Sequence, residues 1–371
     1  MTELLQAVRR SIRYFDWISF GLMLILMSIG LLFIYSATTK PEMPYSIFFK
    51  KQFFGACSAL GIYFFFCIID YRTLMRWGYF LYISVIGFLI FTLVKGSIGM
   101  GGQRWVDLVF FKFQPSEVSK LFFPAFITNH LYSQNDSPKY SMSDFFPIMI
   151  VLAVSALLIR KQPDLGTALL ITFAGAILLW IAGLDKKLFI AGFLAAALCA
   201  PIMWKFLKPY QKQRIAVFLG EGDAHKERYQ IEQSKIAIGS GGITGKGFLQ
   251  GTQNKLMFLP ESRTDFIFSV ICEEWGLLGA FVIIFLYMLL FARILYLIST
   301  VKSFFPQLLA LGLLIHCILA CIINIAMVTG LLPVVGIPLP LISYGISNLW
   351  ITLASLGWIN GITIRRYYIG D

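Results

Sequence analysis

The sequence predicts an all-α membrane protein with about ten transmembrane helices, and three observations lead to this fold class. Hydrophobic residues make up 58% of the 371 residues, and the mean hydropathy is +0.77. Charged residues account for 13%, against roughly 25% in a typical soluble domain. Apolar runs recur along the chain, most of them close to the roughly 20 residues that cross a bilayer core of about 30 Å. Lipid can cover this much apolar side chain, whereas a water-soluble fold of this size cannot bury it.

The predicted spans are separated by charged residues and by Gly or Pro. The first follows Arg9, Arg10 and Arg13 and is too long for a signal-peptide core, so we expect an uncleaved first helix. The spans cover residues 17–36, 52–69, 77–95, 117–133, 145–160, 166–183, 188–207, 266–298, 304–330 and 343–364. With no internal repeat and no interdomain linker, residues 1–371 are predicted to form a single transmembrane domain.

One connection, residues 208–265, is much longer than the others. Loops beyond about 15 residues are usually functional or disordered. This segment is rich in Gly, has no low-complexity tract and shows an apolar alternation around Phe248–Leu259, so we predict an ordered, folded loop.

The positive charges give a weak indication of orientation. An even number of spans places both termini on one side, and Arg9, Arg10 and Arg13 suggest that this side is cytoplasmic. The loop 208–265 is then extracytoplasmic. Under this topology the outer loops are unusually basic, which fits an anionic ligand and the net charge of +12; the alternative is the reverse orientation. Nucleic acid is not expected as a partner, because no Lys/Arg-rich tail or soluble domain is present.

Cysteine and histidine give no sign of a metal or redox site. All six Cys residues lie in apolar stretches without a CxxC pair, and we interpret them as small core hydrophobes. His130, His225 and His316 are too scattered to predict a zinc cluster. The stretch 239–247 superficially suggests a phosphate-binding P-loop, but two of its positions differ from that motif. Its backbone amides could still bind an anion, although tight turns explain the glycines equally well.

Polar clusters interrupt the apolar pattern at four places, and the first is a possible charge pair at a helix start. Pro115 favours the beginning of a helix, which places Glu117 and Lys120 three residues apart on one face. Ionisable groups at the end of a membrane helix are costly unless they are paired or hydrated. These two residues are therefore either a structural ion pair, part of a functional site, or both.

The second and third clusters lie in connections between the predicted spans. Asp164 follows Gln162-Pro163 and is either a helix N-cap or a site residue. The third cluster contains Gln211, Arg214 and Lys246, all in the long loop.

The fourth cluster combines Arg263, Thr264 and Asp265 with Glu273 and Glu274. Asp265 stands at the border between the loop and a strongly apolar helix, where partial desolvation suits a carboxylate that acts as a base. The two glutamates lie roughly 12 Å further along this helix, at 1.5 Å per residue, and require partners there.

These clusters resemble the motifs of the SEDS (shape, elongation, division, sporulation) family of bacterial peptidoglycan polymerases. The similar segments occur in family order across almost the whole chain. They are Arg104-Trp105, Gln114-Pro-Ser-Glu117, Gln162-Pro-Asp164, Leu259-Pro-Glu261, Thr264-Asp265-Phe-Ile-Phe, Gly330-Leu-Leu-Pro-Val-Val-Gly, Pro338-Leu-Pro and Ser343-Tyr-Gly. Residues 245–254 look like the elongation branch of the family rather than the division branch. Two positions depart from the family pattern: Arg263 stands for the usual His, and Ile346 for the second Gly of a Ser-Tyr-Gly-Gly-Ser run.

The resemblance implies a ten-helix fold that polymerises lipid II, the undecaprenyl-pyrophosphate-linked disaccharide, on the outer face of the bacterial inner membrane. It implies that Asp265 is the catalytic base, and an α-linked donor giving a β-linked product would require inversion by single displacement. The implied partners are the nascent glycan strand, a class B penicillin-binding protein and other membrane proteins of the elongation complex. A divalent cation, Mg²⁺ or Mn²⁺, could bind the pyrophosphate, but the sequence has no clear ligand signature for it.

The predicted substrate-binding residues are polar or charged and lie in these clusters and the C-terminal motif. They are Arg104, Gln114, Ser116, Glu117, Lys120, Asp164, Gln211, Arg214, Lys246, Arg263 and Ser343. A lipid II flippase is the main alternative, because a basic groove would also serve a transporter; a division or sporulation member of the same family is another. A flippase needs anion-binding residues accessible from both sides, whereas these clusters gather on one side. A scaffold that only recruits the penicillin-binding protein would have no use for Glu273 and Glu274.

The predicted topology is tested by cysteine labelling. Single cysteines at Gly222 and Ser240, in a cysteine-free background, are expected to react with membrane-impermeant reagents added outside the cell, because both lie in the loop 208–265. Labelling only from the cytoplasmic side would overturn the orientation.

Overall fold

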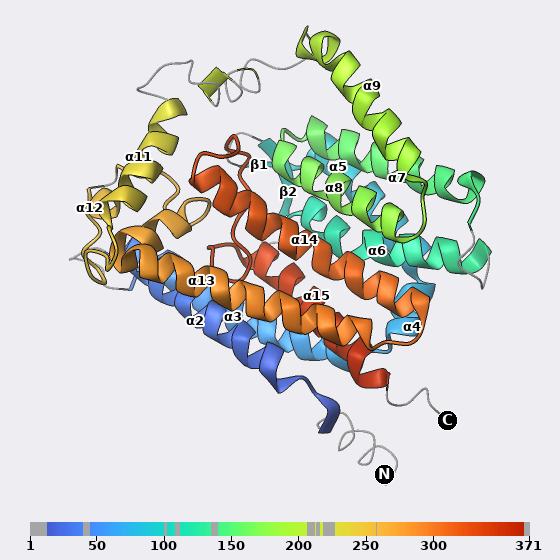
Figure 1. Ribbon diagram of the computed structural model, residues 1–371, viewed down its shortest axis with the longest axis horizontal. Coiled ribbons are helices and arrows are strands. Elements are labelled where there is room, and N and C mark those ends of the chain that lie inside the picture. Colours follow the sequence, from blue (N-terminus) through green and yellow to red (C-terminus); the bar gives the residue numbers. More distant parts are fainter. Residues whose placement is uncertain are drawn as a thin grey trace.

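In the computed structural model the chain folds into a bundle that is mostly helical (Figure 1), as the sequence predicts. The structure describes residues 13–39, 45–99, 102–107, 112–134, 140–205, 212, 216–217, 227–256 and 258–366. Within this part of the chain, a helix occupies each predicted apolar segment. These helices are α2 (Trp17–Thr38), α3 (Ile47–Ile68), α5 (Gly78–Lys95), α6 (Pro115–Gln134), α7 (Met142–Lys161), α8 (Leu165–Ile181), α9 (Lys186–Lys205), α13 (Ile267–Ser299), α14 (Phe304–Val328) and α15 (Ile346–Arg365).

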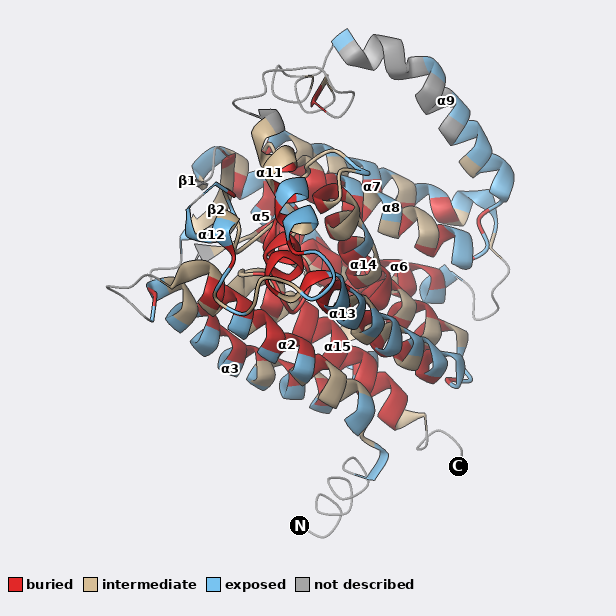
Figure 2. Ribbon diagram, turned by 60° about the vertical axis from the view of Figure 1, so that its left-hand side comes forward, coloured by how far each residue is buried: buried red, intermediate tan, exposed pale blue. Residues whose placement is uncertain are grey.

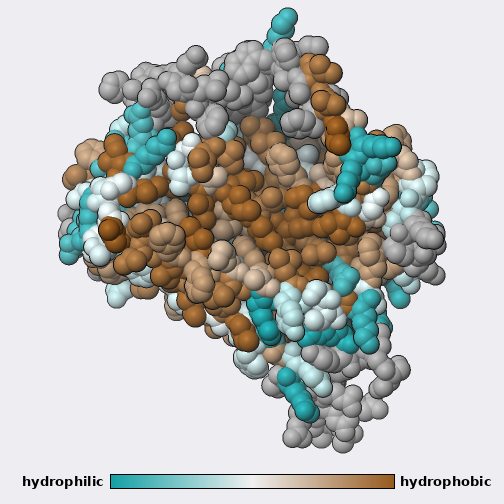
Figure 3. All heavy atoms as spheres, viewed as in Figure 1, coloured by the Kyte–Doolittle hydropathy of each residue, from teal (hydrophilic) through white to brown (hydrophobic). Residues whose placement is uncertain are grey.

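Six helices of the described chain are long and apolar enough to cross a membrane: α2, α3, α5, α7, α13 and α14. Helix α8 is apolar but shorter. Figure 3 shows a broad hydrophobic band across the molecule, with hydrophilic residues gathered above and below it. The chain is therefore a multi-pass membrane protein, and the count of ten spans stays a prediction.

Three short strands and three short helices lie between these longer helices. Strands β1 (Ser97–Gly99), β2 (Gly102–Asp107) and β3 (Lys112–Phe113) form an antiparallel sheet, in which Ser97 is opposite Trp105 and Val106 is opposite Phe113. Helix α4 (Tyr71–Arg76) follows α3, and α11 (Glu227–Ser240) and α12 (Thr252–Lys255) lie within the long connection. None of these elements was predicted, because their sequences contain no apolar run long enough to stand out.

Small residues allow α3 and α15 to approach closely, as is common between membrane helices. A methyl group on Gly357 of α15 would lie 3.0 Å from backbone carbons of Tyr63 in α3 and closer still to its carbonyl oxygen. A methyl group on Gly55 of α3 would lie 2.9 Å from the side chain of Ile346. Figure 2 shows that buried residues concentrate where α6, α13, α14 and α15 meet.

Polar contacts tie several helix ends together at the end of the bundle where α2 begins and α15 ends (Figure 1). Arg293, near the end of α13, forms an ion pair of 2.9 Å with Asp16, which precedes α2. Arg365, at the end of α15, donates a hydrogen bond of 3.1 Å to the carbonyl of Cys67 in the last turn of α3. The starts of α6, α8, α13 and α15 lie at the opposite end of the bundle, and so do the predicted site residues described below.

The close approach of α3 and α15 predicts the stability of two glycine variants. Gly357→Ala should destabilise the protein by roughly 1–3 kcal/mol, the usual cost of overpacking, because the backbone of α3 leaves no room for the methyl group. Gly61→Ala in α3 is the matched control, since its methyl group meets nothing within 4 Å. Thermal unfolding in detergent measures both, and equal midpoints for the two variants would contradict this packing.

Candidate active site

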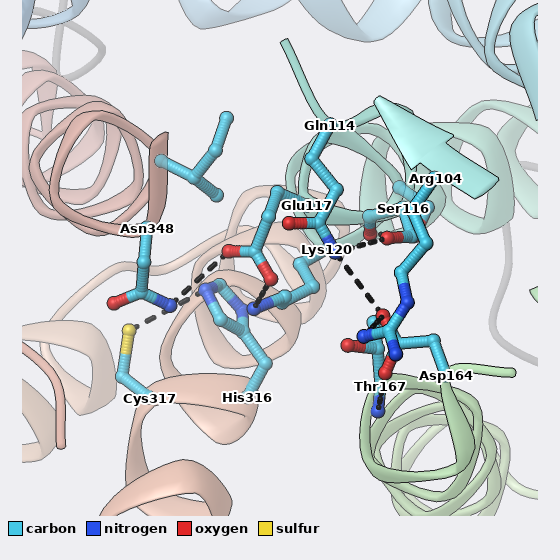
Figure 4. A network of polar contacts seen from close by, with 12 residues as sticks. Arg104, Gln114, Ser116, Glu117, Lys120, Asp164, Thr167, His316, Cys317 and Asn348 are labelled. Carbon is cyan, nitrogen blue, oxygen red and sulfur yellow. Dashed lines mark hydrogen bonds and ion pairs between the residues drawn. The ribbon is translucent and has the colours of Figure 1, made fainter. Parts of the chain in front are cut away.

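Glu117 and Lys120 form a buried ion pair at the start of α6. Lys120 Nζ lies 2.7 Å from Glu117 Oε1, and both side chains are buried. Asn348, in the first turn of α15, donates a hydrogen bond of 3.1 Å from its Nδ2 to Glu117 Oε2. Figure 4 shows Glu117 between Asn348 and Lys120. The spacing that the sequence predicts is thus realised as an ion pair, and Asn348 satisfies the second oxygen of a carboxylate that is taken out of water.

His316 of α14 lies close to this pair (Figure 4). Its side chain is buried, and its Nε2 is 3.4 Å from both Cys317 Sγ and Ser355 Oγ. A small cavity lined by Lys120, Gly312 and His316 lies at the same place. His316 was not predicted as a site residue, because a lone His in an apolar run gives no pattern.

Asp164 caps α8 and also gathers side chains from two other segments. Its Oδ1 accepts a hydrogen bond of 3.1 Å from the backbone N–H of Thr167, so the N-cap interpretation is correct. Its Oδ2 accepts a hydrogen bond of 3.1 Å from Gln114 Nε2 and lies 3.9 Å from Arg104 Nη1. Gln114 Nε2 is also 3.0 Å from Ser116 Oγ. The structure therefore brings four predicted site residues together (Figure 4), with Arg104 paired with Asp164 and the neutral side chains of Gln114 and Ser116 linked to them by hydrogen bonds.

Asp265 lies in the turn that leads into α13, and its side chain is half-buried. The backbone carbonyl of Asp265 accepts a hydrogen bond of 3.0 Å from Asn324 Nδ2 in α14. The hydroxyl of Ser343 donates at 2.7 Å to the carbonyl of the neighbouring Thr264. A Cβ atom on Gly336 would lie 3.6 Å from Asp265 Oδ2, so this glycine adds no side chain next to the carboxylate. Two segments that are distant in sequence thus hold the turn that carries Asp265.

Arg263 is held against an aromatic ring in the same turn. Its guanidinium lies 3.9 Å from the centroid of the Phe48 ring, a close cation–π contact. Its carbonyl accepts a hydrogen bond of 2.9 Å from the backbone N–H of Tyr344. Burial raises the pKa of the Tyr344 phenol above its ordinary value, and the nearby guanidinium of Arg263 opposes this rise. Within the described chain, the other predicted substrate-binding cations pair with carboxylates, whereas Arg263 forms no such pair.

Lys246 contacts other residues of the protein. Its Nζ lies 2.7 Å from Glu273 Oε1 and donates a hydrogen bond of 2.8 Å to Thr252 Oγ1. Gln211 and Arg214, the other two predicted residues of the long connection, lie outside the described residues.

Residues 343–348 link the ion pair of α6 to the turn of Asp265. Ser343 and Tyr344 bind that turn, and Asn348 binds Glu117. Gln52 of α3 supports this link, because its Oε1 accepts a hydrogen bond of 3.1 Å from the backbone N–H of Gly345. Of Ser343, Tyr344, Asn348 and Gln52, only Ser343 was predicted as a site residue. For Asn348 and Gln52 the available signal was an amide side chain inside an apolar helix, since polar groups in a membrane need a partner.

A metal site is not apparent in the described chain. No group of three or more His, Cys, Asp or Glu side chains there is arranged to hold a metal ion. The carboxylates of Glu117, Asp164 and Glu273 are instead bound by cations and amides of the protein. The described residues therefore do not fit a divalent cation held by the protein alone.

The fold and this site define a helical multi-pass membrane protein with paired charges and a carboxylate-bearing turn at one end of its bundle. Residues 16–368 match the model of the FtsW, RodA and SpoVE family, described as cell cycle proteins. The chain belongs to this family, the SEDS family, as its motifs suggest.

Curated relatives carry consistent names. The chain is 40% identical over 297 residues to the peptidoglycan glycosyltransferase MrdB of Escherichia coli K12, covering 80% of each chain. It is 34% identical over 364 residues to the MrdB of Helicobacter pylori strain 26695, covering 96% of this chain and 92% of that one. It is also 34% identical over 370 residues to a probable peptidoglycan glycosyltransferase FtsW of a Geobacter species, with 96% and 98% covered.

Solved structures share the fold. A chain from a study of how a peptidoglycan synthase complex coordinates polymerisation and crosslinking superposes with a TM-score of 0.80 at 27% identity, covering 96% of this chain and 99% of that one. The rod shape-determining protein RodA of Thermus thermophilus superposes with a TM-score of 0.71 at 26% identity, with 95% and 98% covered.

The buried ion pair predicts a non-additive response to mutation. Lys120→Met leaves the Glu117 carboxylate buried without its cation, which typically costs about 3–5 kcal/mol of stability. The double variant Glu117→Gln/Lys120→Met removes both charges and should recover most of this loss. Thermal unfolding of the two single variants and the double variant gives the coupling. Additive losses would show that the two charges do not act as a pair.

Proposed function

We propose that this chain is a peptidoglycan glycosyltransferase that polymerises lipid II into glycan strands during cell-wall elongation. The observation that carries the proposal is the turn of Asp265 and Arg263, held by Ser343, Tyr344 and Asn324 in a chain of the SEDS family. It places a half-buried carboxylate next to a cation that has no carboxylate partner in the described chain. The names of the relatives support the same activity.

The proposed reaction is a single displacement at the anomeric carbon of the donor sugar. The acceptor hydroxyl attacks this carbon and loses its proton to the Asp265 carboxylate, which must lie within hydrogen-bond reach of it. The bond to the lipid pyrophosphate breaks, and undecaprenyl pyrophosphate leaves. The configuration at the anomeric carbon is inverted, and no covalent intermediate with the protein is formed.

Arg263 is the proposed electrostatic partner of the leaving pyrophosphate. A guanidinium can bind two phosphate oxygens at once, and that of Arg263 lies against the Phe48 ring with its Nε buried and without a hydrogen-bond partner in the described chain. A preorganised cation near the departing oxygens stabilises the charge that develops in the transition state. Arg104, Gln114, Ser116, Glu117, Lys120 and Asp164 then shape the site from the side of α6 and α8, and their internal pairing suits a structural role more than direct ligation.

The proposed setting is the outer face of the bacterial inner membrane, with ten spans and both termini in the cytoplasm. The start of α2 and the end of α15 lie at one end of the bundle and the site lies at the other, which supports placing the termini and the site on opposite faces of the membrane. The long connection 208–265 is then extracytoplasmic. The proposed partners are a class B penicillin-binding protein, which cross-links the new strand, and other membrane proteins of the elongation complex.

The elongation member of the family, RodA, is favoured over the division member. The 40% identity to the MrdB of Escherichia coli exceeds the 34% identity to the FtsW of Geobacter, although the latter alignment is longer. The resemblance of residues 245–254 to the elongation branch points the same way.

The proposed base predicts a large loss of rate on removal of its charge. Asp265→Asn keeps the size of the side chain but cannot accept the proton, so polymerisation of purified lipid II should fall roughly 10²–10⁴-fold. Membrane insertion and partner binding should persist, because the contacts that hold the turn use backbone carbonyls. Gel analysis of glycan strands made by the purified, partner-bound protein measures this rate.

Asp70→Asn is the matched control, since Asp70 caps α4, far from the turn of Asp265, and should leave the rate unchanged. An Asp265→Asn protein that elongates glycan at the wild-type rate would remove Asp265 from the mechanism. A wild-type protein that moves lipid II between leaflets without polymerising it would favour the flippase.

A further inference from the structure

Residues 242–253, which lead into α12 and include its first two residues, form a docked segment that packs on a break in α13. Gly276 has φ +65° and interrupts the helix, so residues 267–275 form a short helical piece that begins two residues after Asp265. The break leaves backbone carbonyls of α13 without partners inside the helix, and residues of the docked segment donate hydrogen bonds to them. The N–H groups of Lys246 and Gly247 donate to the carbonyls of Glu273 and Glu274, each at 3.0 Å. Figure 1 shows α11 and α12 gathered at this end of α13.

Two buried carboxylates secure the docked segment. Glu273 Oε1 accepts from Lys246 Nζ at 2.7 Å and from Thr252 Oγ1 and the backbone N–H of Gln253, each at 3.0 Å. Glu273 is completely buried, so its charge depends on these three donors.

The second carboxylate extends the attachment to α2. Glu274 is also buried, and it accepts hydrogen bonds from the hydroxyl of Ser36 in α2 and, at 3.1 Å, from the backbone N–H of Leu249. The two carboxylates thus join three parts of the chain at the break: the docked segment, α13 and α2.

Gly251 makes this arrangement sterically feasible. A Cβ atom on Gly251 would lie 2.9 Å from Glu273 Oε2 and 3.2 Å from Glu274 Oε1. Any larger residue would push the carboxylates away from their donors.

We propose that Lys246 is a positioning residue, whose ion pair with Glu273 fixes the short helical piece 267–275 and with it the place of Asp265. This inference rests on the proposed function. It replaces the expectation that Lys246 binds substrate. Two of the three N–H donors of the Lys246 ammonium are used by Thr252 and Glu273. If the ammonium moved to a substrate, the buried Glu273 carboxylate would lose its cation. A displacement of about 1 Å at the reacting groups is enough to slow a reaction roughly 100-fold.

The test is a double-mutant cycle on polymerisation by the full chain with its penicillin-binding partner. Lys246→Met and Glu273→Gln should each lower kcat roughly 10- to 100-fold and leave KM for lipid II within about two-fold, because both disturb position and neither removes a substrate contact. The double variant should be no slower than the worse single variant. Lys255→Met, an exposed lysine in the last turn of α12, is the matched control and should keep wild-type kinetics.

A KM that rises about ten-fold in Lys246→Met with kcat unchanged would overturn the proposal and restore Lys246 as a substrate ligand. If the fall in kcat of the double variant equals the product of the two single-variant falls, the proposal is overturned as well. Amide hydrogen exchange over residues 241–256 provides a readout that does not depend on activity. Faster exchange in both single variants supports the positioning role of the Lys246–Glu273 ion pair, even if the wild-type protein fails to polymerise lipid II. Exchange at the wild-type rate contradicts that role.

Discussion

Charge buried at one end of an apolar bundle is the constraint on which the rest of this structure depends. Lys120 with Glu117 and Lys246 with Glu273 each place a full charge where water has little access. Desolvation of an unpaired charge would cost several kcal/mol, and each carboxylate is paired with a lysine and accepts a hydrogen bond from at least one further donor in another segment. The need to satisfy these charges is what draws α6, α15 and the end of the long connection together at this end of the bundle.

The turn of Asp265 is held in place by neighbouring contacts at this end of the bundle. Residues 343–348 reach from Glu117 to the carbonyls beside Asp265, and Asn324 binds the Asp265 carbonyl itself. On the other side, the break at Gly276 separates a short helical piece from the rest of α13. The proposed base is thereby fixed from several directions, which preorganises it for the proton transfer of the proposed single displacement.

Much of the helical framework was predictable, because apolar runs of about 20 residues have few other uses. The pairing of Glu117 with Lys120 also followed from local spacing. The partners Asn348, Asn324 and Gln52 could not be predicted, because contacts across the bundle depend on which helices pack together. The hydrophobic periodicity of a single sequence does not show which helices are neighbours. Lys246 was assigned to substrate for the same reason: its partner Glu273 lies 27 residues away, and the two meet only because the segment around Lys246 folds back onto α13.

The central claim is that polymerisation takes place at the turn of Asp265. A structure of the Asp265→Asn protein with lipid II and an acceptor glycan, at a resolution that places the sugar rings, tests it most directly. We expect an acceptor hydroxyl within about 2.6–3.2 Å of the residue 265 side chain, with the donor pyrophosphate on Arg263. Lipid II bound midway through the bundle, with its pyrophosphate away from this turn, would rule out polymerisation at Asp265 and point to transport.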